Sequence, residues 1–533
     1  MNNNFWWQHG IIYHIYPRSF MDHNGDGVGD LRGIINKLDY LSWLGVDAIW
    51  LSPVYPSPMA DAGYDVANYI DIDPLFGSLD DMDELIAEAH QRNLRVILDY
   101  VPNHTSHQHA WFRESRMSRD SPKRDWYIWR DPAPEGGVPN NWLTRFGGHP
   151  AWTWDEPTQQ YYYHTFLPEQ PELNWRSPEL QQAMFDVLRF WCERGSDGFR
   201  IDVIHRIIKD AQLRDNPPNP RWKPGMDPYQ QRLERYTRNQ PEVHDVIRMM
   251  RATVEAYPER ILVGEVNVAV EELMTYYGAG DELHLPFNFQ IIHARLWDAA
   301  DLRRIIDQYE ALLPDSAWPT QVLGNHDEHR ITSKVGAAQA RVGMMLLLTL
   351  RGTPTIYYGD EIGMHDVEIP PELVQDPWEK FVPGIGAGRD PQRTPMQWDT
   401  TSNAGFCPTD VTPWLPIAND YTDINVATAQ TNAHSMLSMT RELIALRRTT
   451  PALTRGNYRS IDAPDGVFAY FRETNDAQVL VVLNVDDQPK QMELPPDLTG
   501  AHVVLSTHMD RLNESIGTTL ELRGDEGLIV KVT

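Results

Sequence analysis

Eight short apolar runs recur between residues 11 and 358, and helical patterns separate most of them. Each run is rich in β-branched or aromatic residues and only a few residues long, which is typical of buried strands. Strands that alternate with helices form parallel βαβ units, and eight such units predict an α/β fold of the (β/α)8 TIM-barrel type. The predicted strands are Ile11–Tyr16, Ala48–Leu51, Arg95–Asp99, Gly198–Val203, Ile261–Glu265, Leu283–Phe289, Thr320–Gly324 and Thr353–Tyr358.

Several segments fall outside this alternation. Residues 105–172, after the third strand, are rich in Trp, Tyr, Pro and Gly and too long for a plain loop, so we expect a small inserted domain over the barrel mouth. Residues 204–240 are polar and Pro-rich, and we expect a lid there; residues 364–425 are also irregular. From residue 457 short strands and turns indicate an antiparallel β-sandwich. The predicted domains are the barrel (1–104 and 173–456), the inserted domain (105–172) and the C-terminal β-sandwich (457–533).

Charge and cysteine content exclude several classes of partner. The net charge of −28 over 533 residues repels phosphate backbones and anionic lipids, so nucleic-acid and membrane partners are not expected. No apolar run approaches the roughly 18 residues of a membrane span, and the first residues lack the pattern of a signal peptide. Cys192 and Cys407 alone cannot build a disulfide framework, which favours a reducing compartment. We therefore expect a cytoplasmic protein, either a monomer or a small homo-oligomer.

Three of the predicted strands end in a carboxylate, and catalytic groups of a barrel lie at its strand ends. Asp202 follows GFRI, Glu265 follows ILVG, and Asp327 follows QVLGNH. One acidic residue at a strand end is common in any fold, but three at one barrel mouth indicate catalysis. A retaining glycosidase needs two such groups close together, one ionised and one protonated.

The neighbours of these carboxylates predict their roles. Arg200 lies two residues before Asp202, so both side chains point to the same face of the strand. A guanidinium beside Asp202 would keep it ionised and nucleophilic, whereas partial desolvation would hold the proton of Glu265 for the leaving oxygen. Asp327 would then hold sugar hydroxyls and offset the charge of an oxocarbenium ion.

Short motifs surround these residues in the order DYVPNH (99–104), GFRID (198–202), GEV (264–266) and NHD (325–327). Together they resemble the four signatures of the α-amylase family of glycoside hydrolases. QPELN (170–174) resembles the fifth signature of that family. GYDV, RTPMQW and YYGDEIG are most similar to bacterial α-glucosidases and oligo-1,6-glucosidases, and the resemblance covers nearly the whole chain.

The resemblance implies that Asp202 is the nucleophile, Glu265 the acid/base and Asp327 the stabiliser of the transition state. It also implies an exo-acting α-glucosidase that releases glucose from the non-reducing end of small α-linked glucosides, such as maltose, isomaltose, sucrose or trehalose. Asp61 and Arg393 would pair to close the pocket floor, with Arg389 as the rival for that role. The pocket residues that it implies are Asp61, Tyr64, His104, Phe166, Gln170, Arg200, His326 and Arg393.

The loop DHNGDGVGD (22–30) is a candidate cation site. Its oxygen ligands would stand at EF-hand positions 1, 3, 5, 7 and 9, but Gly33 replaces the bidentate glutamate of position 12. A metal-free turn of Asp, Asn and Gly is the alternative. Because related α-glucosidases place Ca²⁺ or Mg²⁺ at such a loop, we expect a structural Ca²⁺ (or Mg²⁺) ion and no organic cofactor. The candidate ligands are Asp22, Asn24, Asp26, the Val28 carbonyl and Asp30.

The preferred linkage stays open at this point. In the family that the motifs resemble, valine after the nucleophile accompanies α-1,6 cleavage, and Val203 stands there, although valine is also an ordinary strand residue. The long 204–240 segment instead resembles α-glucosidases of broad or transglucosylating activity. A transglucosidase or a disaccharide isomerase on the same scaffold would share every catalytic residue and is the alternative function.

Overall fold

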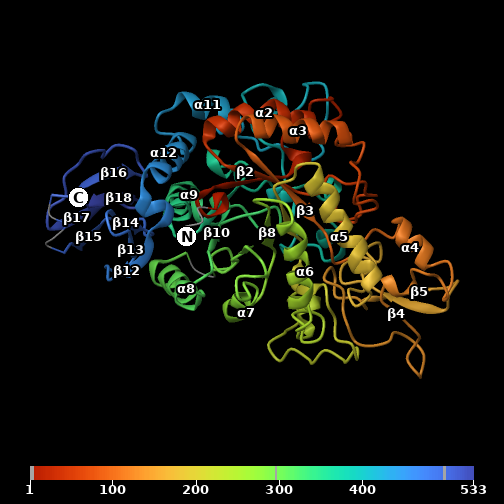
Figure 1. Cartoon of the computed structure of the whole chain (residues 1–533). Helices are drawn as coiled ribbons and strands as arrows, with labels where there is room; N and C mark the ends of the chain where they lie inside the picture. Colours follow the sequence, from red (N-terminus) through yellow and green to blue (C-terminus); the bar gives the residue numbers. More distant parts are fainter. Residues whose placement is uncertain (1–4, 295–296, 496–497, 499, 533) are drawn as a thin grey trace.

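An eight-stranded parallel sheet lies at the centre of the computed structural model, which describes residues 5–294, 297–495, 498 and 500–532 (Figure 1). The strand order is β10-β11-β1-β2-β3-β7-β8-β9, and each neighbouring pair is parallel. Between β9 and β10 the Thr320 hydroxyl donates to the Pro286 carbonyl oxygen at 2.8 Å. The predicted TIM barrel is confirmed. Its strands are β1 (Ile12–Ile15), β2 (Ala48–Leu51), β3 (Arg95–Tyr100), β7 (Gly198–Ile201), β8 (Ile261–Gly264), β9 (Leu285–Pro286), β10 (Thr320–Val322) and β11 (Thr353–Tyr357).

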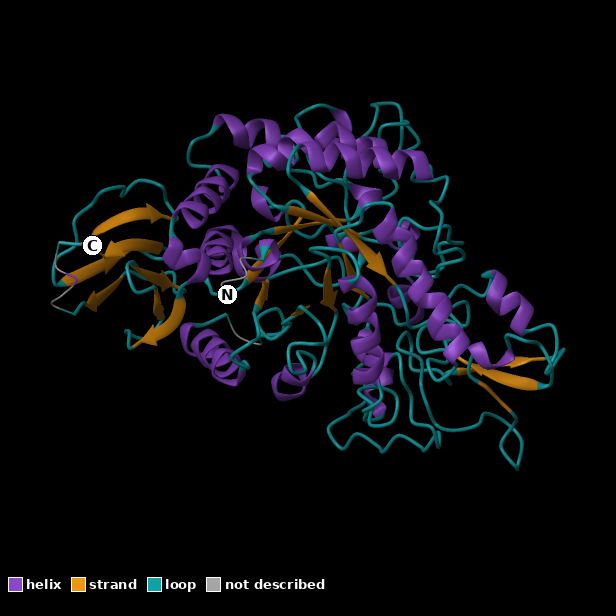
Figure 2. Cartoon of the chain, in the orientation of Figure 1, coloured by secondary structure: helices purple, strands orange, loops and turns teal. Residues whose placement is uncertain are grey.

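Helices surround this sheet on its outside (Figure 2), and local sequence sets where they begin. The Asp30 carboxylate accepts from the Gly33 N–H at the start of α2, and Ser78 forms a capping box with Asp81 at the start of α3. Ser177 caps α5 in the same way. The main helices are α2 (Leu31–Leu44), α3 (Leu79–Gln91), α5 (Pro178–Glu193), α6 (Val243–Glu255), α7 (Val270–Thr275), α8 (Ala299–Leu312), α9 (Ile331–Thr349) and α12 (Met436–Thr449).

The segment between β3 and α5 forms a small body at the edge of the barrel (Figure 1). It contains α4 (Ala110–Ser115) and a three-stranded antiparallel sheet of β4 (Trp129–Arg130), β6 (Gln160–Tyr163) and β5 (Trp152–Asp155). Trp142, Trp152 and Tyr163 fill its own apolar core. This insertion after the third barrel strand agrees with the predicted fold class.

Residues 204–240 are irregular apart from the 3-10 turns η3 (Ile204–Arg206) and η4 (Pro228–Gln231), and they dock on the inserted domain. The Asn141 backbone N–H donates to Asp215, its side-chain amide donates to the Asn216 carbonyl, and the Trp142 indole donates to the Arg214 carbonyl. The expected lid is therefore fastened by hydrogen bonds to the domain beside it.

The C-terminal residues form two antiparallel sheets with a shared core. One has the order β12-β13-β14-β18-β16 and the other pairs β15 with β17. Apolar side chains of both, such as Phe471, Val482 and Leu520, pack together, as expected for a β-sandwich. The strands are β12 (Asn457–Ile461), β13 (Val467–Glu473), β14 (Gln478–Asn484), β15 (Lys490–Glu493), β16 (His502–Ser506), β17 (Thr519–Leu522) and β18 (Gly527–Val532).

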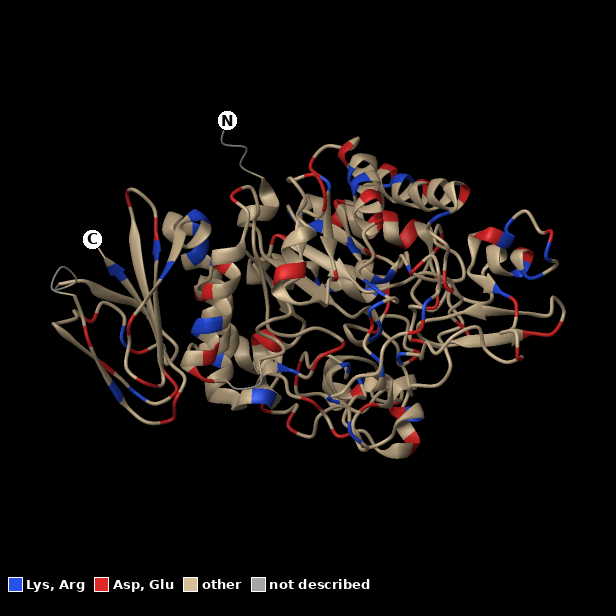
Figure 3. Cartoon of the chain, turned by 90° about the horizontal axis from the view of Figure 1, so that it is seen from below, with Lys and Arg blue, Asp and Glu red and all other residues tan. Residues whose placement is uncertain are grey.

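Charged residues of both signs are spread over the molecule, and the cysteines are buried. Acidic and basic residues are interspersed over helices and loops (Figure 3). Within the described ranges no helix is both long and apolar enough to cross a bilayer. Cys192 and Cys407 are both buried and unbonded.

Candidate active site

A pocket opens among the loops that follow the barrel strands. Its cavity volume is about 150 Å³. Asp202 and Glu265 come directly after β7 and β8, and both line the pocket together with Asp327. The three carboxylates predicted from separate strand ends are therefore brought together. Of the predicted sugar-binding residues, five line the pocket, namely Asp61, Tyr64, His104, Phe166 and His326.

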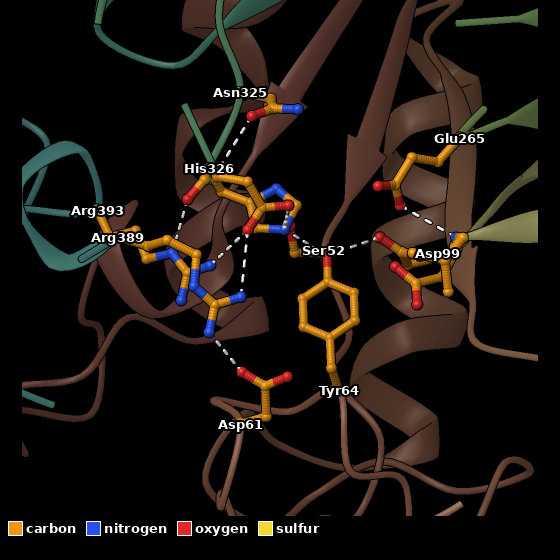
Figure 4. A network of polar contacts seen from close by, with 12 residues as sticks. Ser52, Asp61, Tyr64, Asp99, Glu265, Asn325, His326, Arg389 and Arg393 are labelled. Atoms are coloured by element: carbon orange, nitrogen blue, oxygen red, sulfur yellow. Dashed lines mark hydrogen bonds and ion pairs between the residues drawn. The ribbon is translucent and has the colours of Figure 1, made fainter. Parts of the chain in front are cut away.

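Arg200 organises one side of this site. Its Nη1 donates to Asp202 at 2.7 Å and to Asp99 at 3.0 Å, and its Nη2 donates to Glu265 Oε2 at 2.6 Å. Because a guanidinium is flat and rigid, it sets the nucleophile candidate and the acid candidate at a fixed separation. Figure 4 shows Asp99 and Glu265 together on this flank.

The predicted charge states around Arg200 need correction. Burial raises the pKa of Asp202 well above its ordinary value, and the nearby Glu265 and Asp99 add to this, while Arg200 opposes it. Burial likewise raises the pKa of Asp99 to about 6. Because Arg200 shares one positive charge among three carboxyl groups, it cannot fully offset the cost of burying a negative charge on each of them. Glu265 is also not in an apolar setting, because its Oε2 accepts from Arg200 and from the Val203 N–H at 3.1 Å.

Asp327 has a different electrostatic environment. Burial alone would raise its pKa, but Arg389 and Arg393 together hold that pKa below its ordinary value. Arg393 donates to Asp327 Oδ1 at 2.8 Å and to the His326 carbonyl oxygen at 2.7 Å. Figure 4 shows both arginines on the flank opposite Glu265. The site thus holds one firmly ionised carboxylate, Asp327, opposite Asp202 and Asp99, whose raised pKa values let them retain protons more readily.

The partner of Asp61 is Arg389, so the predicted pairing with Arg393 is wrong. Arg389 Nη2 lies 2.6 Å from Asp61 Oδ1, and the same guanidinium is anchored by Asp376 at 2.6 and 2.9 Å. Arg393 lies deeper and is committed to Asp327 and a backbone carbonyl. Both arginines follow the eighth strand only four residues apart, so the sequence did not decide between them.

The remaining predicted residues form a buried hydrogen-bonded floor. The Tyr64 hydroxyl lies 2.7 Å from His326 Nε2 and donates to Asp99 at 3.1 Å. Gln170 does not line the pocket itself, but its amide lies 3.0 Å from His104 Nε2 and donates to Asp61 at 3.1 Å. Burial lowers the pKa of both His104 and His326, so both are neutral at neutral pH. A closed end lined by fixed polar groups suits a single sugar ring.

Several residues that line the pocket or anchor its arginines were not predicted. Asp99 bonds to Arg200 and Tyr64 beside the pocket and ends the predicted strand Arg95–Asp99, so the strand-end argument that found Asp202 would also have found it. No sequence pattern predicted Asp376 and Trp378, which belong to the irregular stretch after β11. Their positions depend on how that stretch folds back over the barrel. The other unpredicted lining residues are Arg145, Phe146, His205, Arg206, Asn267, Phe289, Asn325 and Glu328.

Val203 has a backbone conformation that is unusual for a β-branched residue. Its φ of 35° and ψ of 42° lie in the left-handed region, which costs on the order of 1–3 kcal/mol. β7 ends before it, at Ile201, so Val203 is not the strand residue that was expected. The turn points its N–H at Glu265, and the residue lines the pocket. Strain is therefore located directly beside the nucleophile candidate.

The 22–30 loop holds the oxygen ligands that a hard cation prefers, and the side chains of Asp22, Asn24, Asp26 and Asp30 already accept hydrogen bonds. Asp22 accepts from the Gly25 and Gly27 N–H groups, and Asp30 accepts from His23, Asn24 and Gly33. A carboxylate oxygen has two lone pairs, so these bonds leave room for a cation. A side chain at Gly33 would meet the Met21 carbonyl oxygen at 1.9 Å, which explains why no glutamate stands there. In the described part of the chain no three His, Cys, Asp or Glu side chains converge on one metal position, so Asn24 and the Val28 carbonyl would have to contribute.

Comparison with known proteins places this geometry in a family. The chain is 40% identical to a probable α-glucosidase of Rhizobium meliloti over 92% of its own length and 91% of that protein. It is 39% identical to an oligo-1,6-glucosidase of Heyndrickxia coagulans, over 92% and 94% of the two chains.

Among solved structures, an α-glucosyl transfer enzyme superposes with a TM-score of 0.93 at 40% identity over 100% of both chains. The trehalulose synthase of Pseudomonas mesoacidophila MX-45 gives 0.89 at 35% identity over 99% of each. The family model described as the alpha amylase catalytic domain matches residues 14–456, which include every carboxylate of the site. This chain therefore belongs to the α-amylase family.

Proposed function

We propose that this protein is an exo-acting, retaining α-glucosidase that releases glucose from the non-reducing end of short α-glucosides. One observation carries the proposal: Arg200 holds Asp202 and Glu265 on adjacent guanidinium nitrogens, at a pocket whose floor is closed by Asp61 and Arg389. A spacing set by one guanidinium suits the roughly 5 Å between carboxyl groups of a retaining enzyme, and is tight for the wider gap of an inverting one. The α-glucosidase and oligo-1,6-glucosidase relatives support the substrate class.

Double displacement assigns each carboxylate a step. An Asp202 oxygen bonds to the anomeric carbon while Glu265 gives its proton to the departing glycosidic oxygen, so the aglycone leaves as an alcohol. Glu265 then takes a proton from water, whose oxygen displaces Asp202 from the sugar and restores the α-configuration. Asp327, held ionised by two arginines, offsets the positive charge of the oxocarbenium-like transition state.

Burial favours the retention of a proton among the carboxyl groups around Arg200, which matters for the first step. The raised pKa values of Asp202 and Asp99 mean that a proton stays near Arg200 at a pH where exposed carboxyl groups have lost theirs. The reaction requires that this proton resides on Glu265 once substrate is bound.

The stereochemistry of the first product tests this mechanism. Proton NMR of an α-glucoside digest should show α-glucose before mutarotation, and Asp202→Asn should stop turnover while leaving the thermal transition intact. Initial release of β-glucose, or near-normal turnover by Asp202→Asn, would contradict double displacement through Asp202.

A transglucosidase or disaccharide isomerase is the second candidate function, and the names of two similar solved structures support it. They carry the names α-glucosyl transfer enzyme and trehalulose synthase. The candidate functions share the glucosyl-enzyme and differ in whether water or a sugar hydroxyl attacks it. Chromatography of products from maltose, isomaltose, sucrose and trehalose separates them: glucose alone, with an equal amount of fructose from sucrose, supports hydrolysis, whereas new oligosaccharides or a sucrose isomer support transfer.

We propose that Val203 contributes to linkage preference. It follows the nucleophile, lines the pocket and is held in a strained conformation by its bond to Glu265. The resemblance of the motifs to oligo-1,6-glucosidases associates valine at this place with α-1,6 bonds. Val203→Ala should move the ratio of kcat/KM for isomaltose over maltose toward maltose; an unchanged ratio would remove Val203 from this role.

We also propose that a Ca²⁺ or Mg²⁺ ion binds the 22–30 loop and stabilises the fold. The ion would be held by Asp22, Asn24, Asp26, the Val28 carbonyl and Asp30, away from the catalytic carboxylates. Chelation should lower the thermal midpoint, and re-addition of Ca²⁺ should restore it, with little change in the catalytic constants of the enzyme that remains folded. A melting curve insensitive to chelator would refute the metal.

A cytoplasmic location is part of the same proposal. Cys192 and Cys407 are buried and free, as thiols are in a reducing compartment. Fractionation of the native host would test it, and recovery outside the cell would contradict it.

A further inference from the structure

Arg145, from the inserted domain, lies in the pocket wall between two aromatic rings. Its guanidinium carbon is 4.1 Å from the ring centre of Trp378 and 5.0 Å from that of Tyr229. The same guanidinium forms an ion pair with Asp227 at 2.9 Å. These partners come from different segments: Trp378 belongs to α10 (Pro377–Phe381), and Asp227 and Tyr229 belong to the 204–240 segment.

The stack stands at the mouth of the pocket rather than at its closed end. Asp61 and His104 line the closed end, Gln170 hydrogen-bonds to both, and all three are at most 3% exposed. The Arg145 side chain keeps 27% of its surface exposed, yet both Arg145 and Trp378 line the pocket. If one glucose fills the closed end, the part of the substrate beyond the cleaved bond must lie at the open mouth, beside Arg145 and Trp378.

Trp378 depends on this stack for its orientation. Its indole N–H is buried and has no hydrogen-bond partner among the described residues, so no polar contact fixes the ring. Arg145 packs on one part of the ring and Phe146 on another, with ring centres of Phe146 and Trp378 5.5 Å apart. Removal of Arg145 would therefore free Trp378 to take other rotamers.

The loop that carries Arg145 packs tightly against the 204–240 segment. A methyl group at Gly148 would lie 2.6 Å from the carbonyl carbon of Pro228, so the inserted domain and the 204–240 segment touch through backbone. Tyr229 in turn accepts from Arg206 at 3.1 Å, and Arg206 lines the pocket near the nucleophile candidate. A continuous row of contacts thus joins α10, the inserted domain and the turn after β7.

We propose that Arg145 is a positioning residue that, through Trp378, shapes the site for the aglycone and for an acceptor sugar, and so sets the ratio of glucosyl transfer to hydrolysis. This inference rests on the proposed α-glucosidase function. A flat indole held across the mouth offers a stacking surface to a second sugar ring, and an acceptor that stays bound competes with water for the glucosyl-enzyme. Arg145 and its ion pair are not required for the chemistry at Asp202.

The test compares Arg145→Leu and Arg145→Lys with the wild type. We measure kcat and KM for maltose, the inhibition constant of glucose, and the ratio of transfer products to released glucose. Arg145→Leu should raise the KM for maltose about tenfold, equivalent to about 1.4 kcal/mol, and lower the transfer ratio several-fold. The inhibition constant of glucose, which fills the closed end, should change less than about twofold. Arg145→Lys keeps the charge near Asp227 but lacks the flat guanidinium, so it should fall in between.

Two further variants separate this role from general loosening. Trp378→Leu removes the ring itself and should reproduce the pattern of Arg145→Leu even if the latter folds poorly. Arg119→Leu is the matched control, because Arg119 also lies on the inserted domain and pairs with Asp131 at 3.0 Å, but does not line the pocket. It should leave the maltose KM and the transfer ratio as in the wild type.

The possible results distinguish a failure of the Arg145 proposal from a failure of the α-glucosidase proposal. An active wild type whose maltose KM and transfer ratio are unaffected by Arg145→Leu and Trp378→Leu overturns the inference alone. A parallel loss of glucose and maltose binding overturns it as well, because the effect would then not be confined to the aglycone side. A wild type that releases no glucose from any α-glucoside refutes the proposed function instead.

Discussion

Arg389→Lys is the sharpest perturbation of the pocket floor. Arg389 is 7% exposed, and its Nη2 and Nε donate to Asp61 at 2.6 Å and to Asp376 at 2.6 and 2.9 Å. Lysine keeps the charge but cannot reach both carboxylates with the geometry of a planar fork. The loss of one to two charge-assisted hydrogen bonds of about 1.5–3 kcal/mol each predicts a fall of about 1.5–6 kcal/mol in unfolding free energy. Because Asp61 lines the pocket proposed to hold the glucose, KM should rise at least about tenfold.

A double-mutant cycle assigns this loss to the correct pair. Urea unfolding of Asp61→Asn, Arg389→Lys and the double variant should give a coupling energy of at least about 1 kcal/mol. The same cycle with Arg393→Lys should give coupling within about 0.5 kcal/mol, because Arg393 bonds Asp327 and not Asp61. Arg393→Lys should instead act mainly on kcat. Strong coupling of Asp61 to Arg393, with none to Arg389, would refute the assignment of Arg389 as the partner of Asp61.

Three further predictions concern charge and backbone. Burial raises the pKa of Asp65 to about 6, above the value of about 3.9 in an unfolded chain, so this residue makes stability fall as pH rises from about 4 to 6. Asp65→Asn removes that slope, and its unfolding free energy relative to wild type should rise by about 3 kcal/mol across this interval and then level off; a pH-independent difference contradicts the burial argument. Gly148→Ala should cost about 1–3 kcal/mol in unfolding free energy and speed proteolysis of residues 204–240, whereas Gly136→Ala, also at positive φ but with open space around it, should leave that segment protected. Asp327→Asn should lower kcat on the order of 10²-fold or more with the fold retained, and a smaller effect on kcat than on KM would argue for simple sugar binding.

The fold and the catalytic carboxylates follow from local patterns. Short apolar runs can be read from sequence because a buried strand must be apolar over its length, and the strand end then places Asp202 and Glu265 without knowledge of the packing. Arg200 was found by the same two-residue periodicity. The periodicity did not show that Arg200 serves Asp99 and Glu265 as well, because those residues come from neighbouring strands whose register only the closed sheet defines.

The electrostatics and the pocket mouth were decided by tertiary structure. Burial sets the pKa of Asp202 more strongly than the adjacent arginine does, and burial is a property of the assembled site. The sequence offers no reason to prefer Arg389 over Arg393 as the partner of Asp61. The path of the chain after β11 brings Arg389, and not Arg393, to Asp61. Arg145, Tyr229 and Trp378 lie far apart in the sequence and outside any repeating pattern, so their stack exists only where three irregular segments meet over the barrel. The sequence by itself thus determined the barrel and its triad of carboxylates, whereas the long-range contacts of loops decided their charge states and the surroundings of the substrate.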